Sequence, residues 1–531
     1  MTARAAHLDA VIVGAGFAGL YMLHRLRSMG LAARVLEAGG GVGGTWYWNR
    51  YPGARCDVVS MEYSYQFSEA LQQEWEWTER YASQPEILAY LDHVADRFGL
   101  RSDIQFDTRV TAAAFDERMN RWTVETAGGE RLNARYCMMA TGCLSRPMLP
   151  RLPGMERFRG EILHTGQWPH GNVDFSGRRV AVIGTGSSGI QCIPVIAREA
   201  EQVYVFQRTG GFSVPARNGP LDPQEQRRIK ADYRGYRQRW AQNPGAADFR
   251  VNMASALEVS EEERRREYEA RWHSGGLPFM GAFRDLLFDA RANETAAEFL
   301  RGKVREFVHD SATAESLLPR QVFACKRLCV DTDYYATFNR PNVALMELNE
   351  SPVEEITATG LRTQSRAFEL DSIVFATGFD AMTGALAAMD IRGRGGLALR
   401  DKWAAGPLTY LGLTTSGFPN LFMITGPGSP SVLSNMVVSI EQHVELISEL
   451  VAQADRRGAR AIEAEEAAER DWVAHVNDVV GATLFRNCNS WYLGANVPGK
   501  PRVFMPYFGF PQYVEKCREM ADAGYSGFNF A

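Results

Sequence analysis

The segment Asp9-Ala10-Val11-Ile12-Val13-Gly14-Ala15-Gly16-Phe17-Ala18-Gly19 combines an apolar run with glycines in the GxGxxG spacing. This arrangement is typical of a buried parallel strand that turns through glycines into a helix. Gly14 makes the tight turn, Gly16 lets the backbone approach a pyrophosphate, and Gly19 lets the helix pack against the strand. The helix N-terminus then faces the phosphates. The segment therefore predicts a dinucleotide-binding unit.

The same pattern occurs twice in the chain. In the first copy we expect a helix over residues 20–29 and a second strand over residues 34–37. In the second copy, residues 180–183 and 203–206 supply the strands around Gly184-Thr185-Gly186-Ser187-Ser188-Gly189. Each copy is a βαβ unit, so the repeat predicts an α/β fold with two Rossmann-like dinucleotide-binding domains.

Two further apolar strands end in the tripeptide Ala-Thr-Gly, within residues 136–142 and 373–378. A tight turn of this kind at a sheet edge is a place where the chain can approach a cofactor or leave the domain. We expect crossovers between the domains at residues 140–143 and 376–380, so that the second nucleotide domain is inserted in the first.

The two copies differ where a ribose would bind. Glu37 follows Gly19 by eighteen residues, and its carboxylate can accept hydrogen bonds from both ribose hydroxyls. At the same distance from Gly189 stands the neutral Gln207, followed by Arg208. A 2′-phosphate repels a carboxylate but pairs with an arginine for about 1.5–3 kcal/mol, roughly a ten- to hundredfold preference for NADPH over NADH. The simplest pairing is FAD in the first domain and NADP(H) in the second.

This pairing predicts the domain bounds. We expect the FAD-binding domain over 1–143 and 380–531, the NADP-binding domain over 144–215 and 321–379, and a helical insertion over 216–320. The mixed charges of residues 261–267 favour a solvated helix face in that insertion. Residues 436–454 place apolar side chains at helical spacing and predict an amphipathic core helix.

Composition limits the kinds of partner. The chain has 531 residues, a formal net charge of −5 and no long basic run, which argues against nucleic acid. Residues 1–7 lead directly into the first strand and leave no room for a signal peptide, and no apolar run reaches the ~18 residues that span a bilayer. We therefore expect a cytoplasmic protein without membrane contact, a monomer or weak homo-oligomer.

The eight cysteines are scattered, without a CxxC pair or a spacing typical of metal ligands. We expect buried or inert thiols and no metal site. A two-nucleotide flavoprotein can be a disulfide reductase, but that chemistry needs a cysteine pair beside the flavin, and Cys56 stands alone near the first glycine loop. The remaining candidate is a monooxygenase.

Two long motifs point to one kind of monooxygenase. Phe158-Arg159-Gly160-Glu161-Ile162-Leu163-His164-Thr165-Gly166-Gln167-Trp168-Pro169 matches FxGxxxHxxxWP, and residues 43–57 read GGTWYWNRYPGARCD. With both, the chain resembles the type I Baeyer–Villiger monooxygenases from its first strand to residues 496–501. Related flavin enzymes that oxidise nitrogen or sulfur usually lack the final Trp-Pro.

The resemblance implies a reaction. NADPH would reduce FAD, O2 would add to the flavin as a peroxide shielded by bound NADP⁺, and the peroxide would attack the carbonyl of a hydrophobic ketone. The product would be an ester or lactone, and sulfoxidation is an expected side activity.

The resemblance also implies site residues. In Cys325-Lys326-Arg327-Leu328-Cys329-Val330-Asp331, Arg327 matches the catalytic arginine, and Asp57 matches the carboxylate that orients it. An arginine suits an anionic peroxide because it keeps its proton at working pH. Lys326 matches a lysine that contacts the NADP 2′-phosphate, and Trp491 matches a tryptophan on a mobile loop that closes over NADP.

The complete set of expected site residues has two parts. The cofactor-binding residues are Gly14, Gly16, Phe17, Gly19, Glu37, Gly44, Thr45, Trp46, Asp57, Gly184, Thr185, Gly186, Ser187, Ser188, Gly189, Arg208, Thr209, Lys326, Arg327 and Trp491. The substrate pocket residues are Val58, Leu144, Ser431, Val432, Leu433 and Met436. Beside Leu144, Cys143 replaces the glutamine of a related sequence, a departure that bears on substrate shape.

Several alternatives stay open. His164 is either a general base or a residue that ties a linker strand to its neighbours, and we favour the second because the peroxide chemistry needs no base there. The alternative for Arg208 is a surface cation without a ligand, and the alternative for Arg327 is an ordinary surface ion pair. Trp46 and Tyr51 either line the flavin or belong to the core. The competing functions are a nitrogen- or sulfur-oxidising monooxygenase and a flavoprotein that senses NADPH without oxygenation.

Overall fold

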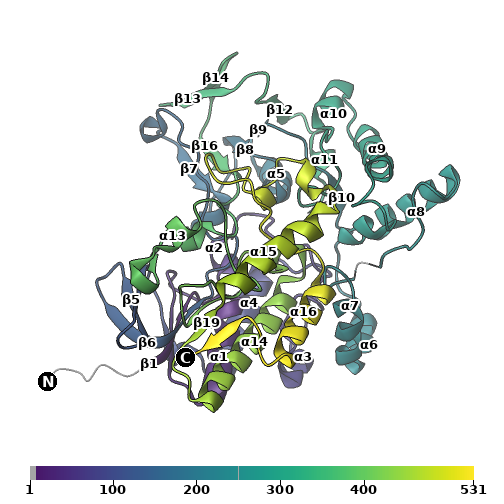
Figure 1. Cartoon of the computed structure of the whole chain (residues 1–531). Coiled ribbons are helices and arrows are strands. Elements are labelled where there is room, and N and C mark those ends of the chain that lie inside the picture. The colour runs from purple at the N-terminus through teal and green to yellow at the C-terminus, as the bar shows by residue number, and fades with distance from the viewer. Residues whose placement is uncertain (1–7, 249) are drawn as a thin grey trace.

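The computed structural model describes residues 8–248 and 250–531 (Figure 1). Residues 1–7, on which the argument against a signal peptide rested, lie outside the described residues. Within the described part, no helix combines the length and the hydropathy needed to cross a membrane.

The first glycine segment lies in an eight-stranded mixed sheet. At its centre, β1 (Leu8–Val13) pairs in parallel with β2 (Ala33–Leu36) and with β6 (Arg131–Met139). The other strands are β3 (Ile104–Gln105), β4 (Val110–Asp116), β5 (Arg121–Thr126), β17 (Asp390–Arg392) and β18 (Leu421–Met423). Since β17 and β18 follow the second domain in sequence, the chain returns to this sheet, and the predicted nesting of the domains is confirmed.

The second glycine segment lies in a separate five-stranded sheet, in which all neighbours are parallel. Its order is β12 (Val343–Glu347), β9 (Gln202–Gln207), β8 (Arg179–Ile183), β16 (Ser372–Phe375) and β7 (Glu161–His164). Apolar side chains bury both faces, as is usual for a parallel sheet. The strands predicted around the second glycine segment are therefore confirmed.

Two helices show how the predicted bounds differ from the observed ones. α1 (Phe17–Ser28) begins three residues before the predicted start, because the glycine loop passes directly into the helix after Gly16. α14 (Met436–Arg457) ends three residues after the predicted end, at Gly458 with a φ of +65°. The predicted apolar face of α14 is buried, and α14 packs against α1.

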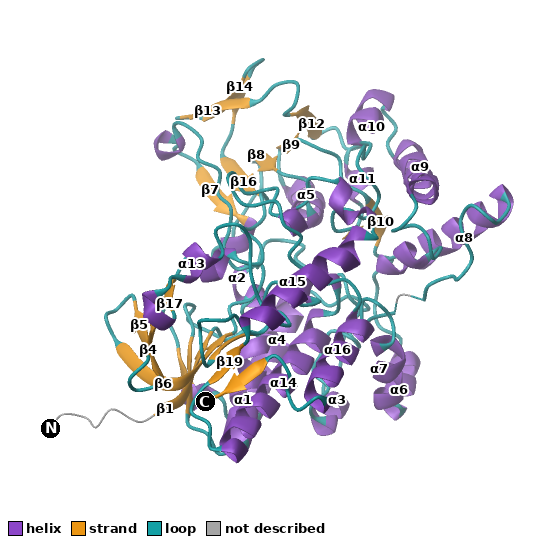
Figure 2. Ribbon diagram, in the orientation of Figure 1, coloured by secondary structure: helices purple, strands orange, loops and turns teal. Residues whose placement is uncertain are grey.

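The helices between residues 216 and 320 do not all lie together (Figure 2) and contribute to three apolar clusters. α6 (Pro223–Ala231) and α7 (Tyr233–Ala241) contribute Ile229, Tyr233 and Tyr236 to the core of the first domain. α8 (Glu261–Ser274) and α9 (Ala290–Phe307) build a separate apolar cluster, and the end of α9 with α10 (Ser311–Leu317) reaches the core of the second domain. The predicted helical insertion is helical, but it is not one packing unit.

The remaining elements connect and cover the two sheets. The helices are α2 (Thr45–Trp48), α3 (Glu69–Glu74), α4 (Gln84–Arg97), α5 (Ser187–Glu199), α11 (Tyr334–Thr337), α12 (Gly384–Ala387), α13 (Leu399–Lys402), α15 (Glu466–Gly481) and α16 (Phe510–Asp522). The strands are β10 (Ser213–Pro215), β11 (Cys329–Asp331), β13 (Val353–Thr357), β14 (Gly360–Thr363), β15 (Ala367–Glu369), β19 (Ile462–Ala464) and β20 (Phe528–Phe530). β10 and β11 pair in parallel and join the two ends of the region that carries α6 to α10.

Candidate active site

The two glycine loops have nearly the same backbone. Gly14 has a φ of +106°, and a Cβ there would lie 2.6 Å from the carbonyl oxygen of Ala140. Gly184 has a φ of +111°, and a Cβ there would lie 2.5 Å from the carbonyl oxygen of Ala376. Ala140 and Ala376 are the alanines of the two Ala-Thr-Gly turns. Each turn thus packs against the first glycine of its own loop, and any side chain at that glycine would meet backbone.

The first site ends in a buried carboxylate. Glu37 is 5 % exposed and accepts hydrogen bonds from the backbone N–H of Ala15 at 2.6 Å and of Gly39 at 2.7 Å. Burial raises the pKa of Glu37, and the backbone donors partly offset that effect. A carboxylate has about four lone-pair positions, so it can also accept from ribose hydroxyls. The residues of this site fit a dinucleotide without a 2′-phosphate.

The second site brings two cations together. Arg208 and Thr209 are exposed at the end of β9. Burial lowers the pKa of Lys326, and the positive charge of Arg208 lowers it further. Gln207 is buried and donates to the carbonyl of Ser316 at 2.8 Å. Two adjacent cations are what a phosphate dianion requires, so these residues fit NADP.

Arg327 and Asp57, 270 residues apart in sequence, form a bidentate ion pair. Arg327 Nε donates to Asp57 Oδ2 at 3.0 Å, and Nη2 donates to Oδ1 at 2.8 Å. Nη1 donates to the carbonyl of Val432 at 2.9 Å. Burial lowers the pKa of Arg327, but the Asp57 carboxylate more than offsets this, so the pKa lies above its ordinary value. Two of the five guanidinium N–H groups remain for a ligand.

A tyrosine that the sequence did not single out lies beside this pair. Tyr492 is 2 % exposed, and burial raises its pKa to about 12, although the nearby Arg327 opposes the rise. Its hydroxyl therefore stays protonated at neutral pH. Tyr492 belongs to the loop between α15 and α16, residues 482–509, which we call the C-terminal loop. Its position next to Trp491 was the only available signal in the sequence.

Most of the predicted pocket residues gather in one apolar cluster next to Arg327. Leu144, Val432, Leu433 and Met436 belong to this cluster together with Tyr492 and Trp491. Ser431 is fully buried and donates to the carbonyl of Ser429. Val58 instead packs in the core of the first domain, directly after Asp57. Cys143 is also in the cluster, and its thiol donates to the carbonyl of Thr425 at 3.1 Å.

His164 lies at the end of β7, an edge strand of the second sheet. Its Nδ1 accepts from the backbone N–H of Gly166 at 2.9 Å, and its Nε2 lies 3.3 Å from the hydroxyl of Thr377 in the second Ala-Thr-Gly turn. Burial lowers its pKa, so the imidazole is neutral. These contacts support a structural role.

The motif of residues 158–169 also lies at the contact between the two domains. Trp168 is buried in the second domain, and its backbone N–H donates to the carbonyl of Trp48 in the first at 3.2 Å. Tyr51 packs in the core of the second domain and donates to Gln191 of α5 at 2.8 Å. Trp46 lies in the core of the first domain. Both motifs therefore lie where the domains meet.

One expectation about the cysteines is wrong. Cys325 and Cys488 form a disulfide across 163 residues of sequence. The other six are free and buried, as expected. No sequence spacing pointed to this pair, because tertiary packing alone brings the C-terminal loop to the segment that carries Arg327.

Comparisons with known proteins match the first half of the chain to a family model and almost the whole chain to known enzymes. A model of the pyridine nucleotide-disulphide oxidoreductase family matches residues 11–263. A phenazine N-monooxygenase of Lysobacter antibioticus is 43% identical over 98% of this chain and 97% of its own length. A Baeyer–Villiger monooxygenase of Pseudooceanicola batsensis is 41% identical over 98% of this chain and 96% of its own length.

Solved structures of monooxygenases are also similar to almost the whole chain. An oxidised steroid monooxygenase bound to NADP is 52% identical, with a TM-score of 0.95 and coverage of 99% of both chains. The closed form of a cyclohexanone monooxygenase has a TM-score of 0.97 at 44% identity, covering 99% of this chain and 100% of its own. The open form of a cyclohexanone monooxygenase, with the same coverage and 42% identity, has a TM-score of 0.92. The chain is thus more similar to the closed arrangement.

Proposed function

The chain belongs to the type I Baeyer–Villiger monooxygenases, FAD- and NADPH-dependent oxidoreductases, and on that premise we propose that it converts a hydrophobic ketone to an ester or lactone. One oxygen atom of O2 is inserted beside the carbonyl. The relatives include enzymes named for cyclohexanone and acetone, which supports a ketone substrate.

The bidentate Arg327–Asp57 pair is the observation that carries the proposal. The reaction develops negative charge on oxygen, and a fixed cation lowers the energy of that charge without reorganisation. Asp57 holds the guanidinium in one orientation and keeps it protonated. The carbonyl of Val432 accepts from a third N–H of Arg327, which leaves two N–H groups that can donate to a ligand.

Each cofactor has its own set of residues. The loop from Gly14 to Gly19, with Glu37 and the segment around Gly44, would hold FAD, and the loop from Gly184 to Gly189, with Arg208 and Lys326, would hold NADPH. Bound FAD, once reduced by NADPH, supplies the activated oxygen. The remaining apolar cluster around Val432 and Met436 would exclude water and hold the ketone. The predicted domain bounds and the cytoplasmic location are part of the same proposal.

The test is a product assay. Purified enzyme with FAD, NADPH and O2 is offered a panel of cyclic, linear and aromatic ketones, and products are identified by mass. We expect at least one ester or lactone that carries one oxygen atom from O2. NADPH oxidation without any ester from the whole panel would contradict the proposal.

A heteroatom oxidation is the second candidate, because a phenazine N-monooxygenase is among the most similar relatives. A competition experiment separates the two: a ketone, a thioether and a fused aromatic N-heterocycle are offered together. Dominant ester formation supports the first candidate, and dominant N-oxide formation supports the second. Sulfoxide alongside ester fits the side activity expected from the sequence.

A further inference from the structure

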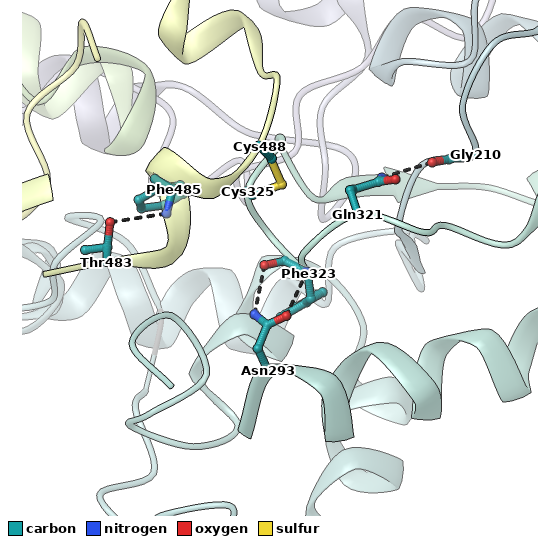
Figure 3. The surroundings of a disulfide bond; sticks show 8 residues. All are labelled: Gly210, Asn293, Gln321, Phe323, Cys325, Thr483, Phe485 and Cys488. Carbon is teal, nitrogen blue, oxygen red and sulfur yellow. Dashed lines mark hydrogen bonds between the residues drawn. A yellow bond between two sulfur atoms is a disulfide. The ribbon is translucent and has the colours of Figure 1, made fainter. Parts of the chain in front are cut away.

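A covalent bond joins two distant segments beside the guanidinium of Arg327. Cys325 lies two residues before Arg327, and its sulfur is bonded to that of Cys488 in the C-terminal loop (Figure 3). The two Cα atoms are 6.2 Å apart, a usual separation for a disulfide. The proposed oxygenation does not use this bond, so its role needs its own explanation.

The Cys325 side is held firmly by other contacts. Asn293 of α9 donates to the carbonyl of Phe323 at 3.0 Å and accepts from its backbone N–H at 2.9 Å (Figure 3). Gln321 donates to the carbonyl of Gly210 at 2.9 Å. Both Asn293 and Phe323 are buried. The segment before Arg327 is therefore fixed without help from the disulfide.

The Cys488 side is held loosely. Leu484 donates to the carbonyl of Leu287 at 2.9 Å, and the side chain of Asn496 donates to the carbonyl of Phe379 at 2.7 Å. Between these two anchors, no backbone hydrogen bond recorded for the described residues leaves the C-terminal loop. Apolar packing, the disulfide and one bond within the loop hold this stretch: the N–H of Met505 donates to the carbonyl of Tyr492 at 2.9 Å, and the carbonyl of Met505 accepts from the N–H of Gly428 at 2.6 Å. With so few hydrogen bonds to the rest of the protein, the stretch depends on its apolar packing and its cross-link to stay in place.

The loosely held stretch carries the tyrosine of the site. The ring of Tyr492 packs edge-on against Phe485 with centroids 6.0 Å apart, and both residues belong to the apolar cluster beside Arg327. Tyr492 keeps its place in this cluster, next to the Val432 whose carbonyl accepts from Arg327, only while residues 485–495 stay in place. The disulfide between Cys325 and Cys488 links that stretch to the well-anchored segment before Arg327, at a point four residues from Tyr492.

We propose that the Cys325–Cys488 disulfide is a positioning element of the active site, which keeps Tyr492 against Arg327, and that reduction of the disulfide releases residues 485–495. Released, the loop exposes the site to water, and less of the NADPH consumed leads to oxygenated product. Only this last effect depends on the proposed function.

The exchange needs a dithiol reductant. One thiolate of the dithiol attacks a sulfur of the disulfide, and its second thiolate closes a cyclic disulfide, so two electrons and two protons leave the dithiol and Cys325 and Cys488 become thiols. Cys488 is half-buried and accessible to a small reagent, whereas Cys325 is buried. The six free cysteines are buried, so native labelling reports on this pair alone.

The test uses FAD-loaded enzyme purified without reductant. Wild type is compared with Cys325→Ser/Cys488→Ser, and with Cys517→Ser as a control that removes a buried free thiol elsewhere. Each is measured before and after dithiothreitol. The readouts are thiol alkylation mapped by mass, hydrogen exchange of residues 485–495, and hydrogen peroxide formed per NADPH with a ketone present.

Reduction of wild type should label Cys488 and speed exchange of residues 485–495 at least about fivefold, the low end of typical coupling energies. The hydrogen peroxide yield should rise with it. The double variant should already show the reduced behaviour and not respond to dithiothreitol, and Cys517→Ser should behave as wild type. The proposal is overturned if reduction is complete but exchange is unchanged, or if both thiols are free in the isolated enzyme while exchange is already slow. Failure of every ketone would instead count against the proposed function, and the exchange result would still stand.

Discussion

The two nucleotide sites have the same backbone but opposite charge where they meet the ribose. Both loops hold their first glycine at a positive φ against the alanine carbonyl of an Ala-Thr-Gly turn. The first then ends in the buried carboxylate of Glu37, and the second in Arg208 with Lys326 near it. The difference shows that backbone geometry makes a dinucleotide site, whereas a few side chains at a strand end choose the dinucleotide. The two domains meet at the Arg327–Asp57 ion pair. Asp57 comes from the first domain. Arg327 lies two residues before the start of β11, where Cys329 contacts Ser187 of the second glycine loop.

The largest difference between the two sites is expected when the first glycine of each loop is substituted. Gly14→Ala should yield protein without FAD, since the new Cβ would meet backbone at 2.6 Å. Gly184→Ala should keep FAD but lose NADPH-driven flavin reduction. Flavin absorbance and stopped-flow reduction measure the two outcomes. Gly30→Ala and Gly177→Ala are matched controls, because both glycines have a positive φ but nothing lies within 4 Å of a Cβ. The same loss in all four variants would mean that strain, not the cradle, is responsible.

The next change removes the residue at which the two sites meet. Arg327→Ala should still allow NADPH to reduce FAD, but ester formation should fall by about a hundred- to a thousandfold, the usual cost of losing a preorganised donor to an oxyanion. Arg327→Lys should recover only part of it, because a lysine cannot form the bidentate pair with Asp57. Steady-state ester formation and single-turnover flavin reduction separate the two steps. Retained ester formation in Arg327→Ala would refute the role.

A smaller change tests the charge at the second site. Arg208→Ala should raise the Michaelis constant for NADPH about ten- to a hundredfold, with little change for NADH, because the lost contact is to the 2′-phosphate. Arg198→Ala is the control, since Arg198 is an exposed arginine on α5 of the same domain. Equal changes for NADPH and NADH would count against phosphate recognition.

The smallest effect concerns the charge at the first site and depends on pH. The working form of Glu37 is the carboxylate, and burial raises its pKa above the ordinary 4.5. As the pH falls, Glu37 takes up a proton earlier than an exposed glutamate, so FAD should be released at a higher pH than otherwise. Any stability that Glu37 gives the FAD-free protein changes in the opposite sense and is lost as the pH rises through the raised pKa.

Flavin fluorescence between pH 4 and 8 measures that release. Glu37→Gln should bind FAD more weakly at neutral pH, by about tenfold, and should show no such pH dependence in this range. Binding of NADP⁺ should not follow the same curve, because Glu37 belongs to the first nucleotide site and not to the second. Identical pH curves for wild type and Glu37→Gln would show that FAD binding does not depend on the Glu37 carboxylate.

Sequence alone determined the parts of this protein that are local in the chain. A strand, a glycine turn and a helix are neighbours within about twenty residues, so their spacing predicts both nucleotide units, and the register of Glu37 against Gln207 and Arg208 follows from counting along the chain. The amphipathic face of α14 is local for the same reason. Arg327 and Asp57 were also found, but through two motifs that resemble a known family rather than through spacing.

Only the tertiary structure decided what joins distant segments. The contact of each Ala-Thr-Gly turn with its glycine loop spans more than a hundred residues, the helical insertion divides between separate cores, and the Cys325–Cys488 disulfide closes 163 residues. Tyr492 became a site residue only because the C-terminal loop packs it into the apolar cluster beside Arg327. Such contacts depend on how buried surfaces pack, and a sequence pattern of period two or 3.6 residues carries no information about which distant surface will be the partner.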